Sequence, residues 1–295
     1  MPRDTTLAPS SLRDLEAGLD ALQTNSPVHI SAGRRALSAA LPPVLFVTGL
    51  IVVWQLVVTV FDVPATTMPS PIAVSASLGD AWASGALGEA LATSLSRGLI
   101  GFVAAIIIGT LLGLLLAESR PLRRAVGPVV SGLMVLPSVA WVPAATLWFG
   151  LTDALVFFVV LMGGVPSIVN GMIAGVSQVP PQLRRVGSVL GASRVQLATL
   201  VVLPAALPGY IAGLKQGWAF SWRGVLAAEI IAVGGSLGTG VGALLQESRQ
   251  ADDLAGVLAA ILVILVIGIV IELAVLSPIE RRVLRGRGLL QEDNS

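Results

Sequence analysis

The chain lacks cysteine altogether and has a single histidine among its 295 residues. Without cysteine there is no disulfide, no thiolate metal ligand and no cysteine nucleophile. The only lysine, Lys215, follows Leu214, so the chain has no Gly-Lys-Ser/Thr phosphate loop. Nor does the sequence show a metal-ligand cluster of histidines or paired carboxylates. We therefore expect a protein that is not an enzyme and that binds no metal and no cofactor of its own.

Charge is scarce as well. Charged residues make up 12% of the chain, against about 25% in a soluble domain. The sequence instead contains runs of about 20 apolar residues, each long enough to cross the ~30 Å hydrocarbon core of a lipid bilayer. Backbone groups in lipid must be satisfied within the segment, which favours helices over open strands. The sequence predicts an all-α integral membrane protein with six spans at about 41–60, 94–116, 126–148, 154–173, 201–232 and 254–276.

The basic residues are distributed unevenly between the loops. Of the 18 Lys and Arg residues, 14 lie in the two tails or in the loops at 117–125 and 174–199. Cytoplasmic loops attract Lys and Arg, so both termini and these two loops are predicted to be cytoplasmic. Arg97 and Arg249 fall on the opposite side, together with most of the loop carboxylates.

The expected organisation has three parts. Residues 1–40 form a cytoplasmic tail, residues 41–276 the six-span domain, and residues 277–295 a basic cytoplasmic tail. Leucines at helical spacing within residues 12–22 predict a short amphipathic helix in the first tail, on the membrane surface or, alternatively, on a partner.

A basic, helix-compatible segment between two apolar runs is the most informative part of the chain. In residues 176–200 and just beyond, Gly191 is followed by Val201 and then by Leu203-Pro204. This spacing resembles the cytoplasmic coupling loop of ABC importer permeases, in which a short helix docks on a separate ATPase. The alternative is a basic inner loop that only maintains the topology.

The resemblance narrows in two other segments. Residues 135–150, VLPSVAWVPAATLWFG, and the pairs Asn170-Gly171, Gly175-Val176 and Pro180-Pro181 are similar to the nitrate, taurine and alkanesulfonate branch of this family. The resemblance implies a type I importer permease in the bacterial cell membrane, acting as a homodimer with two ATPase subunits and an extracytoplasmic solute-binding protein. ATP and Mg would be bound by the ATPase, the lipid bilayer would be the surroundings, and no nucleic acid would be involved.

The resemblance also implies which residues face the ATPase. Arg185 departs from the family pattern, which has an acidic residue at this position. The predicted coupling residues are Arg184, Arg185, Leu190, Gly191, Ala192, Ser193, Leu203 and Pro204.

The fifth span carries charged residues within its apolar sequence, and charges inside a membrane often mark a pathway or an ion pair. Helical geometry places Lys215, Trp218, Trp222 and Glu229 on one face. A second series, Gly209, Gly213, Gly217 and Ser221, suits tight helix packing. This polar, aromatic face is predicted to form one wall of a solute path. Alternatively, Lys215 pairs with a backbone carbonyl or with another span, while Arg223 and Glu229 reach outward.

The third span contains Pro137 and Pro143, and each proline removes a helix hydrogen bond. These prolines predict either a bent helix lining the path or two packing kinks. The predicted path residues are Lys215, Trp218, Trp222, Arg223, Glu229, Trp141 and Pro143.

The sequence disfavours two other functions, those of a serine hydrolase and of a self-contained transporter or channel. A Gly-x-Ser-x-Gly string spans residues 234–238, but the only histidine, His29, is far from Ser236 in the sequence and on the other predicted side, so a turn is expected instead. A self-contained secondary transporter or channel subunit would need internal repeats, and the sequence shows none that is convincing. The expected function is uptake of a small anion of the sulfonate, taurine or nitrate type, with the substrate as the open question.

Overall fold

A computed structural model describes residues 32–286, and its elements in this range are all helical. The chain divides into two compact units, and the division falls inside helix α2 (Ala32–Val60), after Val52. Helix α2 begins within the predicted tail, and its apolar part, Leu41–Val60, matches the first predicted span. The amphipathic helix expected at residues 12–22 lies outside the described residues.

The six predicted apolar runs all appear as helical segments. Five are long and apolar enough to cross a membrane by themselves, and the bent pair Arg120–Val135 and Ser138–Phe149 makes a sixth span if its two helices are counted together. The elements after α2 are α3 (Pro71–Ala83), α4 (Ala86–Glu118), α5 (Arg120–Val135), η1 (Ser138–Trp141), α6 (Val142–Phe149), α7 (Asp153–Gln178), α8 (Pro181–Val189), α9 (Arg194–Gln196), η2 (Leu197–Val202), α10 (Leu203–Ile231), α11 (Val241–Gln250), α12 (Leu254–Ile271), η3 (Glu272–Leu276) and α13 (Ser277–Arg285).

The third predicted span is broken rather than kinked. Helix α5 ends before Leu136, and the axis turns by 101° before η1 and α6 continue. Pro137 lies at the break, where its missing N–H interrupts the helix. Pro143 lies in the first turn of α6, where the backbone N–H has no helical partner in any case. Only the first of the two prolines therefore accounts for the bend.

Helices α4, α7 and α10 form the densely packed centre of the larger unit. A Cβ added to Gly213 would lie 2.6 Å from the Cα of Gly171, and one added to Gly209 would lie 2.6 Å from the Cα of Gly175. Helix α4 also packs closely on α7, because a Cβ on Gly109 of α4 would meet Ile168 at 2.8 Å. Small residues that let helix backbones approach closely drive packing in lipid. The glycine series predicted for the fifth span thus has the packing role expected of it, and Gly109 of the second span packs in the same way.

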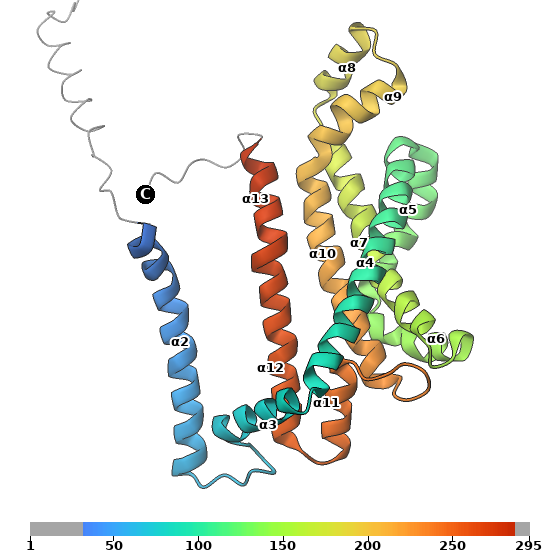
Figure 1. Cartoon of the computed structure of the whole chain (residues 1–295). Coiled ribbons are helices and arrows are strands. Elements are labelled where there is room, and N and C mark those ends of the chain that lie inside the picture. Colours follow the sequence, from blue (N-terminus) through green and yellow to red (C-terminus); the bar gives the residue numbers. More distant parts are fainter. Residues whose placement is uncertain (1–31, 287–295) are drawn as a thin grey trace, which may run out of the picture. The chain divides into compact units, whose positions relative to one another are not determined.

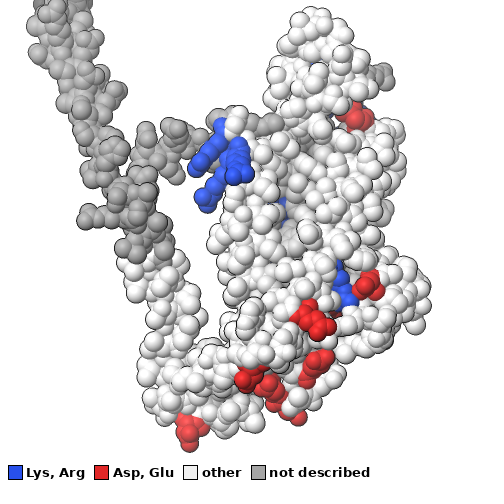
Figure 2. Space-filling view, viewed as in Figure 1, with Lys and Arg blue, Asp and Glu red and all other residues white. Residues whose placement is uncertain are grey.

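The two ends of the larger unit differ in character (Figure 1). Helices α8 and α9 project from the end of α7 and α10 at which α13 also lies. The loop 232–240 and helix α11 lie at the other end, near α3. Basic side chains gather at the α13 end and acidic side chains near α3 and α11 (Figure 2). This is the charge separation that the loop composition predicts.

Candidate functional site

The predicted coupling segment begins with helix α8, whose end is defined by backbone chemistry. Gly191 has φ +80, a left-handed conformation that glycine adopts without steric cost. The N–H of Ala192 donates to the carbonyl of Gly187 at 3.0 Å, and the N–H of Gly191 donates to Ser188 at 3.1 Å. These two bonds form a Schellman motif, which satisfies the last carbonyls of the helix. Gly191 is therefore required by the fold of the turn itself.

The next helical turn begins two residues later with a reciprocal cap. The Ser193 N–H donates to the Gln196 side-chain oxygen at 2.8 Å, and the Gln196 N–H donates to Ser193 Oγ at 3.2 Å. This capping box starts α9, which runs on through the π-helical η2 into α10. Helix α8 packs back onto η2, because a Cβ on Gly187 would meet the Leu197 side chain at 2.5 Å. The segment is thus a compact helix–turn–helix joined directly to the fifth span.

The tip of this segment exposes apolar side chains. Val189 is 85% exposed and Leu190 is 80% exposed, and Val186 and Val195 are also exposed. Clustered exposed apolar side chains on a structured element mark an interaction surface. Of the predicted coupling residues whose side chains are described, Arg185, Leu190, Gly191 and Ser193 are exposed at the tip, Arg184 and Ala192 are partly buried, and Leu203 and Pro204 belong to the start of α10.

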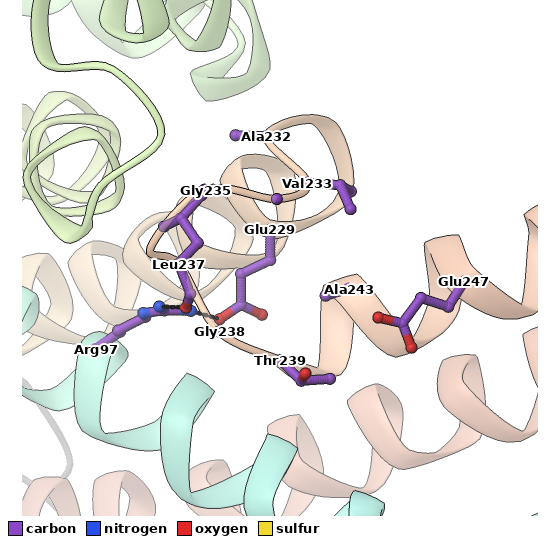
Figure 3. A pocket seen from close by; sticks show the side chains of 11 residues that line it. Arg97, Glu229, Ala232, Val233, Gly235, Leu237, Gly238, Thr239, Ala243 and Glu247 are labelled. Atoms are coloured by element: carbon purple, nitrogen blue, oxygen red, sulfur yellow. Dashed lines mark hydrogen bonds and ion pairs between the residues drawn. The ribbon is translucent and has the colours of Figure 1, made fainter.

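A second candidate site lies at the opposite end and is built on a buried ion pair. Arg97 of α4 is 5% exposed and Glu229 of α10 is 2% exposed. Arg97 Nη1 donates to Glu229 Oε1 at 3.0 Å, and Arg97 Nε donates to Asp153 Oδ1 at 2.9 Å. Arg97 Nη2 donates to the carbonyl of Leu237. The guanidinium thus connects α4 to the end of α10 and to the loop that follows it (Figure 3), and through Asp153 also to the start of α7.

The carboxylate of Glu229 is equally well occupied. Its Oε2 accepts from Ser94 Oγ at 2.7 Å and from the N–H of Gly242 at 3.1 Å. Ser94 Oγ in turn accepts from the N–H of Val241 at 2.8 Å. A buried charge is stable only when it is paired and hydrogen-bonded, and both members of this pair meet that condition. The cluster anchors the first turn of α11 to α4 and α10.

The loop between α10 and α11 closes over this cluster. Gly234, Gly235 and Gly238 have positive φ values, so the Gly-x-Ser-x-Gly string is the turn expected from the sequence. The Ser236 N–H donates to the carbonyl of Leu151 at 3.3 Å. Beside the loop is a hollow of about 220 Å³ lined by Arg97, Glu229, Thr239, Glu247 and the loop backbone (Figure 3). Because Arg97 already has three acceptors, this hollow does not present a free cation to an anionic solute.

The residues predicted to line a path are distributed over several environments. Lys215 Nζ lies 2.7 Å from a carboxylate oxygen of Glu272 and 2.7 Å from one of Glu280, both at the end of the last span. The pairing with another span, left open by the sequence, is thus present. Trp218 and Trp222 are buried and stacked on each other with ring centroids 6.1 Å apart. Trp218 also meets the Phe102 ring of α4 at 5.3 Å.

The other predicted path residues lie elsewhere. Arg223 is exposed, with its guanidinium 5.7 Å from the Phe220 ring centroid. Trp141 packs edge-on against Phe158 at 5.9 Å, and Pro143 lies in α6 beside it. Among the described residues, the predicted path side chains do not surround one common cavity. They remain a prediction for the assembled transporter.

Three residues of the cluster around Arg97 and Glu229 were not predicted from the sequence as site residues. Ser94 and Arg97 contact Glu229 directly, and Asp153 is linked to it through Arg97. All three lie at least 76 residues from Glu229 in the chain. One signal was present: Arg97 is a basic residue at the predicted outer end of an apolar run, on the side where the loop carboxylates gather. A basic residue in that position needs an acidic partner.

Comparison with known proteins decides the family. Residues 101–283 match the family described as "Binding-protein-dependent transport system inner membrane component". The chain belongs to this family. The matched region includes the predicted coupling segment, the bent pair α5–α6 and the glycine-packed helices. The permease is therefore a subunit of an ABC importer and not an enzyme, and the secondary-transporter and channel alternatives are set aside.

Individual relatives place the permease within the family. It is 29% identical to the taurine transport system permease TauC of Escherichia coli, over 82% of this chain and 88% of the relative. It is 27% identical to the nitrate import permease NrtB of Synechocystis, over 78% and 84%. It is also 33% identical to the riboflavin transport system permease RibX of Chloroflexus aurantiacus, over 69% and 75%. These relatives support the nitrate, taurine and sulfonate branch of the family, which is the branch that the sequence predicted.

The fold agrees with this placement. A chain of the MetNI methionine ABC transporter, solved in inward-facing conformations, superposes with a TM-score of 0.58 over 67% of this permease and 95% of that chain, at 20% identity. The type I importer permease fold is confirmed. Membership of the family implies a bacterial inner membrane location, an ATPase partner and a solute-binding protein partner.

Proposed function

We propose that the permease forms one half of the path by which a small anion of the sulfonate, taurine or nitrate type enters the cell. A second copy would supply the other half, and two ATPase subunits would bind ATP and Mg. The observation that carries the importer role is the compact helix–turn–helix of residues 181–202, with its exposed apolar tip and its direct continuation into α10, and the substrate class rests on the taurine, sulfonate and nitrate relatives. That arrangement can transmit a displacement from a docked protein to a membrane span.

Coupling would work through this segment because it has few internal degrees of freedom. The Schellman turn at Gly191 and the capping box at Ser193 fix its two helices relative to each other. A docked ATPase that moves α8 would therefore move the start of α10 with it. Nucleotide binding then favours one of two permease states by its differential affinity for them.

The path itself is proposed to run beside the break between α5 and α6. Non-helical backbone at membrane depth is tolerated where protein covers it or where it lines a water-filled cavity. Trp141 and Pro143 lie at this break, and Trp148 beyond them is exposed. Lys215 would contribute only if the solute displaced Glu272 or Glu280, because both carboxylates already occupy its ammonium.

The proposal for the substrate is tested on the solute-binding partner and then on the assembled transporter. Calorimetry of the partner against taurine, an alkanesulfonate, nitrate, bicarbonate and riboflavin should give heat with one of the sulfonates or inorganic anions. Uptake of the same compound into vesicles containing the full complex should then depend on ATP. Binding of riboflavin alone, a compound named for one relative, would reject the small-anion proposal while leaving the importer function intact.

A further inference from the structure

The last helix, α13, carries three arginines on the side away from the protein. Arg281, Arg282 and Arg285 are exposed, whereas Glu280 is turned inward and accepts a hydrogen bond from Lys215 Nζ at 2.7 Å. At ~100° per residue the arginines lie about 100–200° around the helix from Glu280. Within residues 32–286 no carboxylate lies within ion-pair distance of any of the three. The ion pair on one face therefore holds the arginine face outward.

The position of these arginines along the last span matches the level of lipid headgroups. The candidate span runs as one segment from Leu254 to Arg285. At ~1.5 Å per residue, Arg281 lies about 40 Å and Arg285 about 46 Å from Leu254. The hydrocarbon core is ~30 Å thick and the bilayer with its headgroups ~40–45 Å. The helix begins directly after Asp253, so its first residues lie among the headgroups of one leaflet, and a length of about 40–46 Å brings the three guanidiniums to the headgroups of the opposite leaflet.

Apolar side chains lie just below the arginines on the surface of the protein. Leu273, Val275 and Ile279 are exposed in the turns that precede them. A surface with apolar side chains below and guanidiniums above matches the acyl chains and the phosphate of one lipid molecule. Guanidinium binds phosphate with paired, charge-assisted hydrogen bonds. Figure 2 shows the basic side chains gathered at this end of the span.

We propose that Arg281, Arg282 and Arg285 form a binding site for the headgroup of an anionic phospholipid, such as phosphatidylglycerol. The site would hold the end of the last span at the membrane surface. Through the Glu280–Lys215 bond it would also hold α10, the helix that continues from the coupling segment. Lipid composition would in this way affect the element on which the ATPase acts.

The test is lipid binding to the assembled permease–ATPase complex in detergent, counted by native mass spectrometry during titration with phosphatidylglycerol or phosphatidylcholine. The wild type should prefer phosphatidylglycerol. Arg281→Gln, Arg282→Gln and Arg285→Gln should each weaken that binding about fivefold, with the losses accumulating in the triple variant.

The matched control is the triple substitution Arg120→Gln, Arg123→Gln and Arg124→Gln, which removes the same charge from α5 and should leave the preference intact. Replacing the three α13 arginines by lysine should retain most of the binding, because the charge remains.

Several results would overturn the site. An equal loss in the α5 control would mean a general attraction between basic residues and anionic lipid. Displacement of the lipid by inorganic phosphate at similar concentration would mean a phosphate-ion site. Unchanged lipid binding combined with failure of the α13 triple variant to assemble with the ATPase would assign the surface to the protein partner.

Discussion

At the scale of single residues, the buried pair of Arg97 and Glu229 is the contact with the largest expected effect. Both side chains are almost fully buried, and each has at least three hydrogen-bond partners. Such a pair need not add stability relative to an apolar replacement, but loss of one member leaves the other charge buried without compensation. The pair thus fixes the positions of α4, α7, α10 and α11 relative to one another, rather than raising the free energy of unfolding.

Glu229→Gln is expected to destabilise the permease by about 3 kcal/mol, the lower end of the range for a broken buried pair, because Asp153 still contacts Arg97. The measurement is thermal unfolding of the purified complex. Glu247→Gln is the control: this carboxylate lines the same hollow but is exposed, and its loss should change stability by less than about 0.5 kcal/mol. Equal effects of the two substitutions would show that burial of the pair has no energetic consequence.

At the scale of elements, the coupling segment depends on the backbone conformation of one turn. A Cβ at Gly191 would meet nothing within 4 Å, so space in the permease does not require glycine there. The positive φ value does, since most side chains disfavour it. The turn sets the direction in which Val189 and Leu190 face outward, and with it the surface that we propose binds the ATPase.

Gly191→Ala should strain this turn and lower transport-coupled ATP hydrolysis, at a cost of about 1 kcal/mol in the local structure. Gly191→Asn should retain most of the activity, because asparagine tolerates the left-handed region. ATP hydrolysis by the reconstituted complex is compared with the amount of assembled complex for each variant. If Asn were as damaging as Ala or worse, close approach of the ATPase to Gly191 would be the better explanation.

At the scale of the whole molecule, the two ends of the larger unit have opposite character. One end carries the coupling segment and the arginines of α13, and the other carries the Arg97 cluster and the acidic side chains near α3 and α11. Cytoplasmic surfaces of membrane proteins are enriched in Lys and Arg. The first end is thus predicted to be cytoplasmic, and the packed helices α4, α7 and α10 connect the two.

The predicted orientation is measurable by thiol labelling, because the chain has no cysteine. Ser188→Cys, exposed on α8, should react with an impermeant maleimide only from the cytoplasmic side. Gln250→Cys, exposed at the end of α11, should react only from outside. Right-side-out vesicles expose the outer face to the reagent and inverted vesicles expose the cytoplasmic face. The cysteine-free wild type controls for background labelling. The reverse pattern of labelling would contradict the orientation and would place the α13 arginines at the outer leaflet.

Much of the architecture was predictable from the sequence because it depends on local patterns. Apolar runs of sufficient length become membrane spans wherever they stand in the chain, since the bilayer imposes the same length on each. Glycines four residues apart mark a close-packing face, as at Gly209 and Gly213. The turn at Gly191 and the cap at Ser193 also involve only near neighbours in sequence.

What the sequence determined by itself was therefore the positions of the apolar helices, the separation of charge between the two ends and the family to which the chain belongs. Only the tertiary structure decided which side chains meet. Glu229 finds Arg97 across 132 residues, and Lys215 finds Glu280 across 65. A helical wheel places Trp218 and Trp222 on one face of α10, but it does not say that Phe102 of α4 covers that face. Periodicity describes one helix at a time, whereas partners are chosen by the packing of several.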